Sequence, residues 1–447
     1  MEKINTSGYL FSNKDLRKLI LPLIAEQFLT IFVGLADSIM VASVGEAAVS
    51  AVSLIDTVMV LIINTFAALA TGGAIVAGQA LGRNDKKEGC KTTEQLLMIC
   101  TLATTAIMLL VYIFKGFILH VVFGNIEHDV MANCNTYLLI VAASIPFIGI
   151  YNVGAAVHRA MGDSKTPMIM SLVMNGTNLV GNAILLYGLK FGIEGAAIPT
   201  MASRVLAGIF MLYLMKNKDK TLHVNHIFKI KPRKRIIKKI LRIGVPYGIE
   251  NSMFQLGKVT VLALVSSFGT TSIAANAVAN NVCLFSNLTG IAIGFAMSAV
   301  IAQCVGAGDY KQVRYYTKKL MKISYLGIII ISTIIILAMP FINKIYGLSE
   351  ATGKLTTEIV FYHNIVSMII WPLAFNLSSV LRAANNAGFC LWIAMISMWV
   401  FRIGFSFIFA KFMGMGVFGV WVAMTTDWLA RAVCFIIKIK GKSWQHW

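Results

Sequence analysis

The sequence has 447 residues, of which 57% are hydrophobic and only 13% are charged, whereas soluble domains carry about a quarter charged residues. This composition excludes an ordinary soluble protein and favours a chain embedded in lipid. The formal net charge of +20 would suit a nucleic-acid partner, but the basic residues gather in alternate loops between apolar runs, which is the pattern of membrane topology.

Taken in chain order, the apolar runs give candidate membrane spans, each close to or above the roughly 20 residues that cross the hydrocarbon core. They are 16–43, 48–81, 92–114, 130–157, 166–188 and 193–215, then 240–267, 273–304, 319–340, 357–381, 389–410 and 417–438. The first run carries Glu26 and Asp37 and lacks a small-residue cleavage site, so we interpret it as a span and not as a signal peptide. We therefore expect an all-α polytopic membrane protein with twelve transmembrane helices in two pseudo-symmetric six-helix lobes.

Basic residues gather in every second loop, and therefore on one side of the predicted helices. They crowd the segment before the first span, the loops after the second, fourth and eighth spans, and above all the stretch 216–242. The opposite loops carry few basic residues, among them Lys115, Lys190, Lys344 and Lys411. Because loops rich in Lys and Arg stay in the cytoplasm, the pattern predicts a multi-pass protein of the cytoplasmic membrane with both termini cytoplasmic. The predicted domains are an N-terminal lobe 1–215, a basic linker 216–239 and a C-terminal lobe 240–447.

Other chemistries lack their sequence signatures. The seven cysteines include no Cys-x-x-Cys pair and are interpreted as small apolar packing residues, and the seven histidines show no metal-ligand spacing. No Gly-x-x-x-x-Gly-Lys-Ser/Thr loop is present, so ATP is not expected to be a direct energy source. No set of nucleophile, base and orienting residue indicates an enzyme. We expect no metal site and no cofactor beyond a coupling ion, H⁺ or Na⁺.

The two halves of the sequence repeat one another. One constant shift aligns 22–87 without a gap to 246–311, and it pairs Pro22 with Pro246, Glu26 with Glu250, Gly45 with Gly269, and Gln79 with Gln303. A shift one residue shorter pairs Arg159 with Arg382. Because each half has six spans, both halves start and end on the same side of the membrane. The pattern predicts a parallel repeat, with a cleft between two lobes that rock to give alternating access.

These features resemble the multidrug and toxin extrusion (MATE) family, over nearly the whole chain. The resemblance rests on Pro22 followed fifteen residues later by Asp37 in Ala-Asp-Ser-Ile-Met-Val, on Gln79 with Leu81-Gly82, and on the run from His158 to Asp163, His-Arg-Ala-Met-Gly-Asp. It implies secondary active export of organic, often cationic and aromatic, compounds in exchange for protons or sodium. The expected partners are small-molecule organic substrates and membrane lipids, without nucleic acid, and we expect the chain to work as a monomer.

Polar side chains inside the predicted spans are candidates for the transport site, because a charge at mid-membrane costs about 2.5 to 3.5 kcal/mol and usually faces a cavity. The resemblance assigns proton or ion binding to Asp37, and Asn178 and Asn182 match the pattern that faces this acid. Asp37 aligns with Val261 of the second half, so the predicted coupling site is not duplicated. Further cavity candidates are Glu26, Thr30, Asp56, Tyr137, Asn152, Asn175, Thr200, Glu250 and Lys258.

Several candidates have a structural interpretation that the sequence leaves open. Glu26 and Glu250 recur at equivalent positions, which suits a repeated structural role as well as chemistry. Lys258 either pairs with an embedded acid such as Asp37, Asp56 or Glu250, or extends to the membrane surface. Asp427 and Arg431 lie one helical turn apart, and this spacing predicts a structural ion pair.

The sequence also departs from the family. Some members have an acid where this chain has Asn182, and sodium-coupled members have acids where it has Phe254 and Trp371. These departures leave Asp37 as the main proton candidate and count against a sodium site in the C-terminal lobe. Two other functions stay open. One is a flippase for a lipid-linked saccharide, and the embedded cations Lys258 and Arg402 are the features that favour it. The other is a membrane receptor or assembly factor without transport, and its only support is the basic linker.

Overall fold

The computed structural model describes residues 8–124, 127–225, 230–441 and 444–445, and every regular element within them is helical. The chain divides into two compact units. The N unit is Arg17–Gly248, and the C unit joins the segment up to Leu16 to Ile249–Trp447. The predicted linker 216–239 falls inside the N unit, and its residues 226–229 lie outside the described residues.

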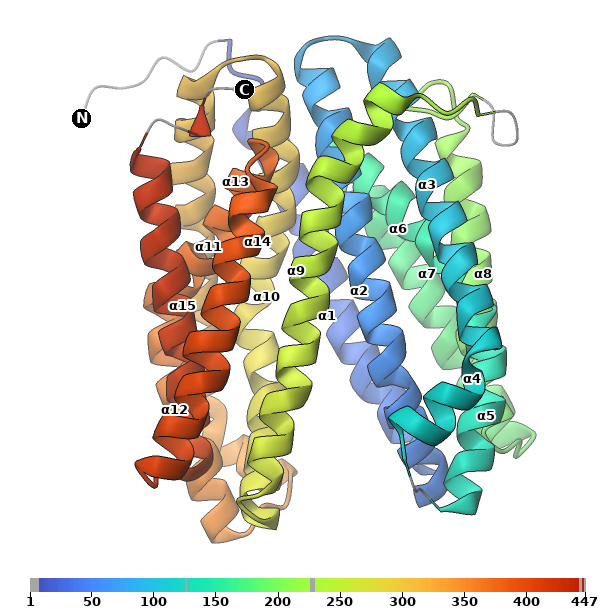
Figure 1. Cartoon of the computed structure of the whole chain (residues 1–447), viewed down its shortest axis with the longest axis vertical. Coiled ribbons are helices and arrows are strands. Elements are labelled where there is room, and N and C mark those ends of the chain that lie inside the picture. Colours follow the sequence, from blue (N-terminus) through green and yellow to red (C-terminus); the bar gives the residue numbers. More distant parts are fainter. Residues whose placement is uncertain (1–7, 125–126, 226–229, 442–443, 446–447) are drawn as a thin grey trace. The chain divides into compact units, whose positions relative to one another are not determined.

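The helices follow one another in both units in the order drawn in Figure 1. The N unit contains α1 (Asn13–Ala42, from Arg17 on), α2 (Glu46–Gly82), α3 (Lys86–Ile113), α4 (Lys115–Phe117), η1 (Ile118–Val122), α5 (His128–Ala142), α6 (Ile145–Ala160), α7 (Lys165–Asn182), η2 (Ala183–Gly188) and α8 (Glu194–Met215). The helix α9 (Lys234–Ser266) begins in the N unit and continues into the C unit. The C unit continues with α10 (Thr270–Gly306), α11 (Tyr310–Ile345), α12 (Glu350–Trp371), η3 (Pro372–Asn376), α13 (Leu377–Ala383), α14 (Ala387–Ile396), η4 (Ser397–Gly404), η5 (Phe407–Phe412) and α15 (Gly416–Lys440).

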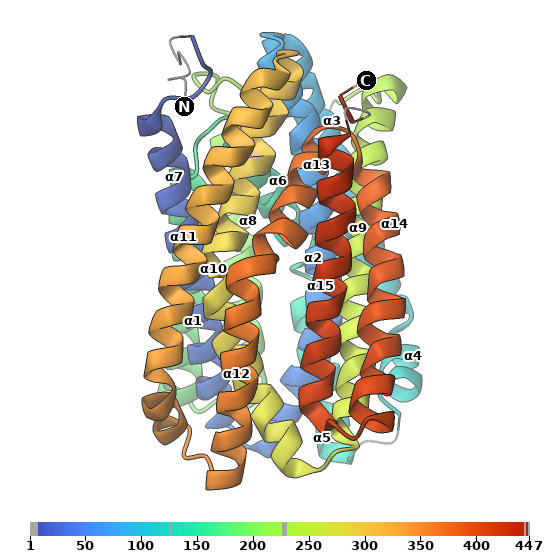
Figure 2. The same ribbon diagram turned by 90° about the vertical axis from the view of Figure 1, so that its left-hand side faces the viewer.

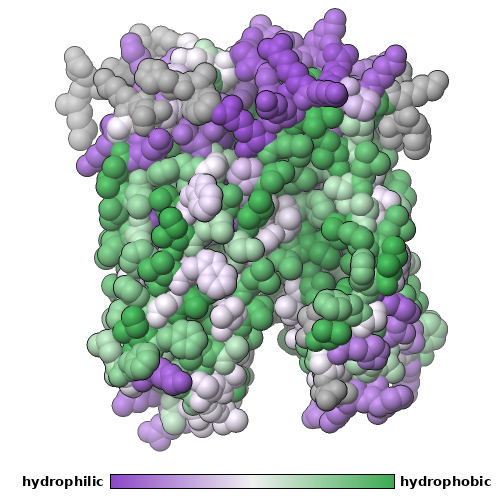
Figure 3. Space-filling view, viewed as in Figure 1, coloured by the Kyte–Doolittle hydropathy of each residue, from purple (hydrophilic) through white to green (hydrophobic). Residues whose placement is uncertain are grey.

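The helices account for the predicted spans. Among the described residues, ten helices are long and apolar enough to cross a membrane, and α5 with α6, bent by 48°, makes an eleventh. The remaining predicted span, 240–267, corresponds to α9, whose Glu250, Asn251 and Lys258 make it more polar than the others. In each unit apolar side chains cover the middle of the helices, and hydrophilic side chains gather toward their ends (Figure 3). The predicted all-helical membrane fold is confirmed.

Some helices begin earlier than hydropathy predicts. Helices α3 and α11 start at Lys86 and Tyr310, ahead of the predicted starts at residues 92 and 319. Their first turns are basic, so they are hydrophilic although their backbone is helical. An aspartate caps each helix. The backbone N–H of Glu88 donates to Asp85 at 2.8 Å, and those of Lys311 and Gln312 donate to Asp309 at 3.0 Å.

The repeat extends to the turns between helices. Asn84 and Gly308, which the alignment of 22–87 with 246–311 makes equivalent, have φ angles of 60° and 73°. Gly162 and Asn385, equivalent under the shift that pairs Arg159 with Arg382, have φ angles of 82° and 62°. Glycine and asparagine are the residue types that most readily adopt this left-handed backbone. The same turn is therefore built twice, with glycine in one half and asparagine in the other.

The apolar core of each unit uses equivalent positions. Val41 and Ala51 are buried in the N unit, and their counterparts Val265 and Ala275 are buried in the C unit. All seven cysteines are free thiols and six of them are buried, as expected for small packing residues.

Three long helices change to π-helical geometry within their length, a feature frequent at functional sites. The change falls at Ala183 after α7, at Pro372 after α12 and at Ser397 after α14. Figure 2 shows α12 and α13 following one another with a bend where η3 lies between them. Two of these changes lie next to the polar groups described below.

Candidate functional site

A chain of polar side chains crosses three helices of the N unit. The Asn182 side-chain amide on α7 donates a hydrogen bond to the carboxylate of Asp37 on α1. One turn earlier, Asn178 Nδ2 donates to Thr200 Oγ1 on α8 at 3.0 Å, and the two asparagines are linked at 3.5 Å. We call these four residues the polar relay. The two amides lie on one face of α7 because four residues make about one helical turn.

Three of the four residues of the polar relay are buried, Asp37 is half-buried, and one atom of the relay lacks a described partner. Asn182 is 0% exposed, and Asn178 and Thr200 are 9% and 8% exposed. Within the described residues, Asn182 Oδ1 accepts no hydrogen bond. A buried carbonyl oxygen without a donor is unfavourable, so this atom is suited to receive a proton donor or a cation.

Two further candidates and one arginine lie beside the polar relay. Tyr137 lies close enough to Asp56 and to Thr200 for their side chains to interact electrostatically. The positive charge of Arg204 on α8 acts on both Asp37 and Asp56, and its Nη1 donates to Ser144 Oγ at 3.3 Å. The Asp37 cluster, as we name this set, comprises Asp37, Asp56, Tyr137, Asn178, Asn182, Thr200 and Arg204.

The sequence interpretation missed Arg204, although a signal was present. It is a single arginine inside the predicted span 193–215, one turn after Thr200 on the same face of α8. A cation at that depth is expected to lie near acidic groups, and Asp37 and Asp56 are acids on which the charge of Arg204 acts.

The other N-unit candidates lie elsewhere. Thr30 Oγ1 donates to the backbone carbonyl of Glu26 at 2.8 Å, Asn175 Nδ2 donates to Ser171 Oγ at 3.2 Å, and Asn152 Nδ2 is buried without a described partner. Glu26 forms an ion pair with Arg159 at 2.5 Å. Glu26 and Asp37 therefore belong to different groups of side chains, although both are on α1.

The ion pair of Glu26 has an equivalent in the C unit. Arg382 Nη1 donates to both carboxylate oxygens of Glu250, at 3.2 and 3.1 Å. Both partners of the pair recur in the repeat, since Glu26 aligns with Glu250 and Arg159 with Arg382. The geometry favours the repeated structural role for Glu26 and Glu250, because a carboxylate bound to a guanidinium is a poor ligand for a further cation.

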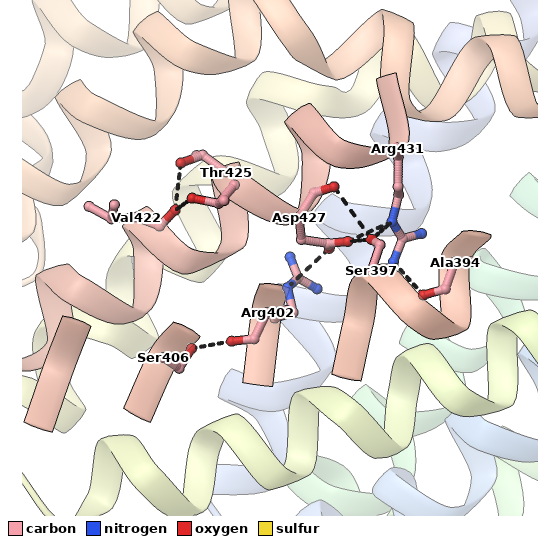
Figure 4. A network of polar contacts seen from close by, with 9 residues as sticks. Ala394, Ser397, Arg402, Ser406, Val422, Thr425, Asp427 and Arg431 are labelled. Atoms are coloured by element: carbon pink, nitrogen blue, oxygen red, sulfur yellow. Dashed lines mark hydrogen bonds and ion pairs between the residues drawn. The ribbon is translucent and has the colours of Figure 1, made fainter. Parts of the chain in front are cut away.

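The C unit has its own buried polar group, drawn in Figure 4. The predicted pair is present, with Arg431 Nε 2.7 Å from Asp427 Oδ1. It is part of a larger network, because Ser397 Oγ donates to Asp427 and Arg402 Nε lies 3.6 Å from Asp427 Oδ2. Lys258 forms no ion pair with a described carboxylate of the C unit and lies 5.0 Å from the ring centroid of Phe254. Of the acids considered as partners of Lys258, Glu250 is bound by Arg382.

These features define a class of protein before any relative is considered. Two repeated bundles of membrane-spanning helices, with carboxylates and amides buried among apolar side chains, describe a membrane transporter. Comparison with known proteins agrees. The MatE family model matches residues 22–184 and 246–408, two segments displaced by the same shift as the repeat. The chain belongs to the MatE family, whose members are transporters and not enzymes.

Named relatives and solved structures cover nearly the whole chain. An uncharacterized transporter of Bacillus subtilis, YisQ, is 25% identical over 432 residues, covering 95% of this chain and 93% of the relative. A probable multidrug resistance protein of Thermotoga maritima, NorM, is 24% identical over 450 residues, covering 97% and 93%. The structure of a multidrug resistance MATE family transporter of the MOP superfamily in an outward-facing conformation superposes with a TM-score of 0.88 at 20% identity, covering 96% of this chain and 95% of that one.

Proposed function

We propose that this protein is a secondary active exporter, which moves organic, often cationic and aromatic, compounds out of the cell in exchange for protons or sodium. The observation that carries the proposal is the polar relay, whose two amides and threonine hydroxyl are buried and which ends on the half-buried carboxylate of Asp37. An embedded carboxylate can bind an ion whose gradient drives transport. Relatives named as probable multidrug resistance proteins support the class of substrate.

The polar relay can accommodate both protonation states of Asp37. As a carboxylate, Asp37 accepts the hydrogen bond that the Asn182 amide donates. A protonated Asp37 would instead donate, and a half-turn of the Asn182 side chain would present Oδ1, which has no described donor. Proton binding therefore replaces one hydrogen bond by another. A sodium ion could be bound by the carboxylate of Asp37 and by Asn182 Oδ1, because hard cations prefer oxygen ligands.

The charges of the Asp37 cluster explain how ion and substrate could exchange. Asp37 and Asp56 carry two negative charges when ionised, and Arg204 carries one positive charge. The excess of one negative charge is neutralised by one proton, one sodium ion or one cationic substrate. Because uncompensated charge is unfavourable within the membrane, ion and substrate compete for this charge. This competition is the coupling that antiport requires.

The orientation and assembly of the transporter follow from the same reasoning. Basic residues gather on the first turns of α3, α9 and α11. We expect these ends, and with them both chain termini, on the cytoplasmic side of the cell membrane. We expect a monomer to be the functional form, since each chain supplies both halves of the repeat.

Transport by the purified protein in liposomes tests the proposal. Ethidium flux is measured under an imposed proton gradient, with and without sodium, for the wild type, Asp37→Asn and the control Glu46→Gln, whose carboxylate is exposed at the start of α2. We expect gradient-driven flux in the wild type and the control, and none in folded Asp37→Asn. Absence of gradient-dependent flux with either ion would refute the proposal. Wild-type flux in Asp37→Asn would move the coupling site elsewhere.

A further inference from the structure

Two cations within the helices of the C unit lie on one aromatic ring. The Lys258 ammonium on α9 is 5.0 Å from the Phe254 ring centroid, and the guanidinium carbon of Arg402 on η4 is 5.1 Å from it. The two positive charges are thus separated by no more than about 10 Å, within the distance over which charges interact in protein. Arg402 is also the charged neighbour that acts on Lys258.

The carboxylates of the C unit do not balance these charges. The nearest acid to Arg402 is Asp427, whose Oδ2 lies 3.6 Å from Arg402 Nε. Asp427 is already bound by Arg431 at 2.7 Å and by Ser397 (Figure 4). Arg402 and Arg431 share the carboxylate of Asp427, and Lys258 forms no ion pair with a described carboxylate of the C unit. Two positive charges remain in excess.

Donors of both cations are available to a ligand. In the described part of the chain, the Nη groups of Arg402 donate to no other residue, although the side chain is only 6% exposed. The Lys258 side chain is exposed and makes no described ion pair, and Glu250 is bound to Arg382. An unpaired cation within a span costs more than one aromatic contact offsets. An anion is the group that would complete this arrangement.

We propose that Lys258, Arg402 and Phe254 form a subsite for the carboxylate or phosphate group of an aromatic organic substrate, and this proposal rests on the export function proposed above. The planar guanidinium can bind such a group through two parallel N–H bonds, and the ammonium adds a mobile point charge. The Phe254 ring provides an apolar surface for the aromatic body of the substrate. The subsite carries the opposite charge to the Asp37 cluster of the N unit, so this transporter should accept anionic and zwitterionic compounds as well as cations.

Equilibrium binding to the purified protein tests the subsite without transport. The probes are norfloxacin, an aromatic carboxylate, and its methyl ester, measured by fluorescence anisotropy in nanodiscs of phosphatidylcholine. We expect the wild type to bind the acid more tightly than the ester. Lys258→Gln should weaken binding of norfloxacin by about 10-fold, the effect of one charge-assisted hydrogen bond, and should leave binding of the ester unchanged. Lys258→Arg should retain most of the affinity.

Controls separate the subsite from folding and from lipid binding. Lys344→Gln removes another exposed lysine, near the end of α11, and should change neither affinity. Thermal unfolding of each variant in the same nanodiscs identifies misfolded protein. Lys258 is substituted and not the buried Arg402, because replacing an exposed side chain disturbs the fold less. Equal binding of acid and ester by the wild type, or equal losses for both probes in Lys258→Gln, would overturn the proposal. So would loss of the preference when phosphatidylglycerol is added, because the site would then hold a lipid headgroup. Flux in liposomes is measured separately from binding. A protein without export activity can therefore be distinguished from a protein without this anion subsite.

Discussion

Breaking the Glu26–Arg159 ion pair should strongly destabilise the protein. Arg159 Nη2 and Glu26 Oε1 are 2.5 Å apart, and the two side chains are 13% and 5% exposed. The variant Glu26→Gln removes this carboxylate from the largely buried charge of Arg159. Removal of one partner from a buried pair typically costs about 3 to 5 kcal/mol, and the high burial places this pair in that range.

The loss can be measured by equilibrium unfolding in mixed micelles of dodecylmaltoside and SDS, followed by circular dichroism. Arg159→Gln should cost a similar free energy of unfolding. The double variant Glu26→Gln with Arg159→Gln should cost clearly less than the sum of the single losses, because neither charge is then left uncompensated. The pair Glu250 and Arg382 should behave in the same way, since its contacts are equivalent.

Two results would refute this reasoning. The first is a loss below about 1 kcal/mol for Glu26→Gln, which is the range of a solvent-exposed pair. The second is a double variant whose loss equals the sum of the single losses, because independent residues add in this way. Glu46→Gln, which changes an exposed acid of the same unit, serves as the control and should be nearly neutral.

Three further predictions concern single residues. Asp309→Ala should lower the free energy of unfolding by about 1 kcal/mol through loss of a helix cap. The Gln312 backbone N–H holds the pKa of Asp309 below its usual value. The difference in stability from the wild type should therefore be present at pH 7 and disappear as the pH falls through the folded-state pKa of Asp309. Gly308→Ala, at a φ of 73°, should cost about 1 kcal/mol in the same assay, and an unchanged midpoint would contradict it. Arg204→Gln should reduce gradient-driven ethidium flux by about 10-fold, whereas Arg204→Lys should retain most of it; wild-type flux in the glutamine variant would contradict the charge count at Asp37.

The sequence predicted the helices well because membrane spans are apolar over a length set by the bilayer. It located their ends less well. The first turns of α3 and α11 are basic and helical, and hydropathy does not distinguish such a turn from a loop. The left-handed turns between the helices were not predicted from the sequence. A signal was present, because Asn84 and Gly308 occupy equivalent positions and both residue types readily adopt the left-handed backbone.

The candidate site was predicted in part, for reasons that depend on the residues. The spacing of Asn178 and Asn182 indicates one helix face, but only the family resemblance indicated that this face meets Asp37. The pairing of Glu26 with Arg159 was missed because the two residues are 133 positions apart, and helix periodicity carries no information at that separation. The repeat did hold the information, because both residues recur in the second half as Glu250 and Arg382.

The measurement that tests the central claim most directly is proton release on substrate binding. Ethidium is added to the purified protein in weakly buffered, sodium-free detergent solution, and a pH indicator records the protons released per molecule bound. If substrate and proton compete for the charge of the Asp37 cluster, the wild type should release protons in proportion to binding, and folded Asp37→Asn should release none. Equal release by the wild type and Asp37→Asn would contradict the account.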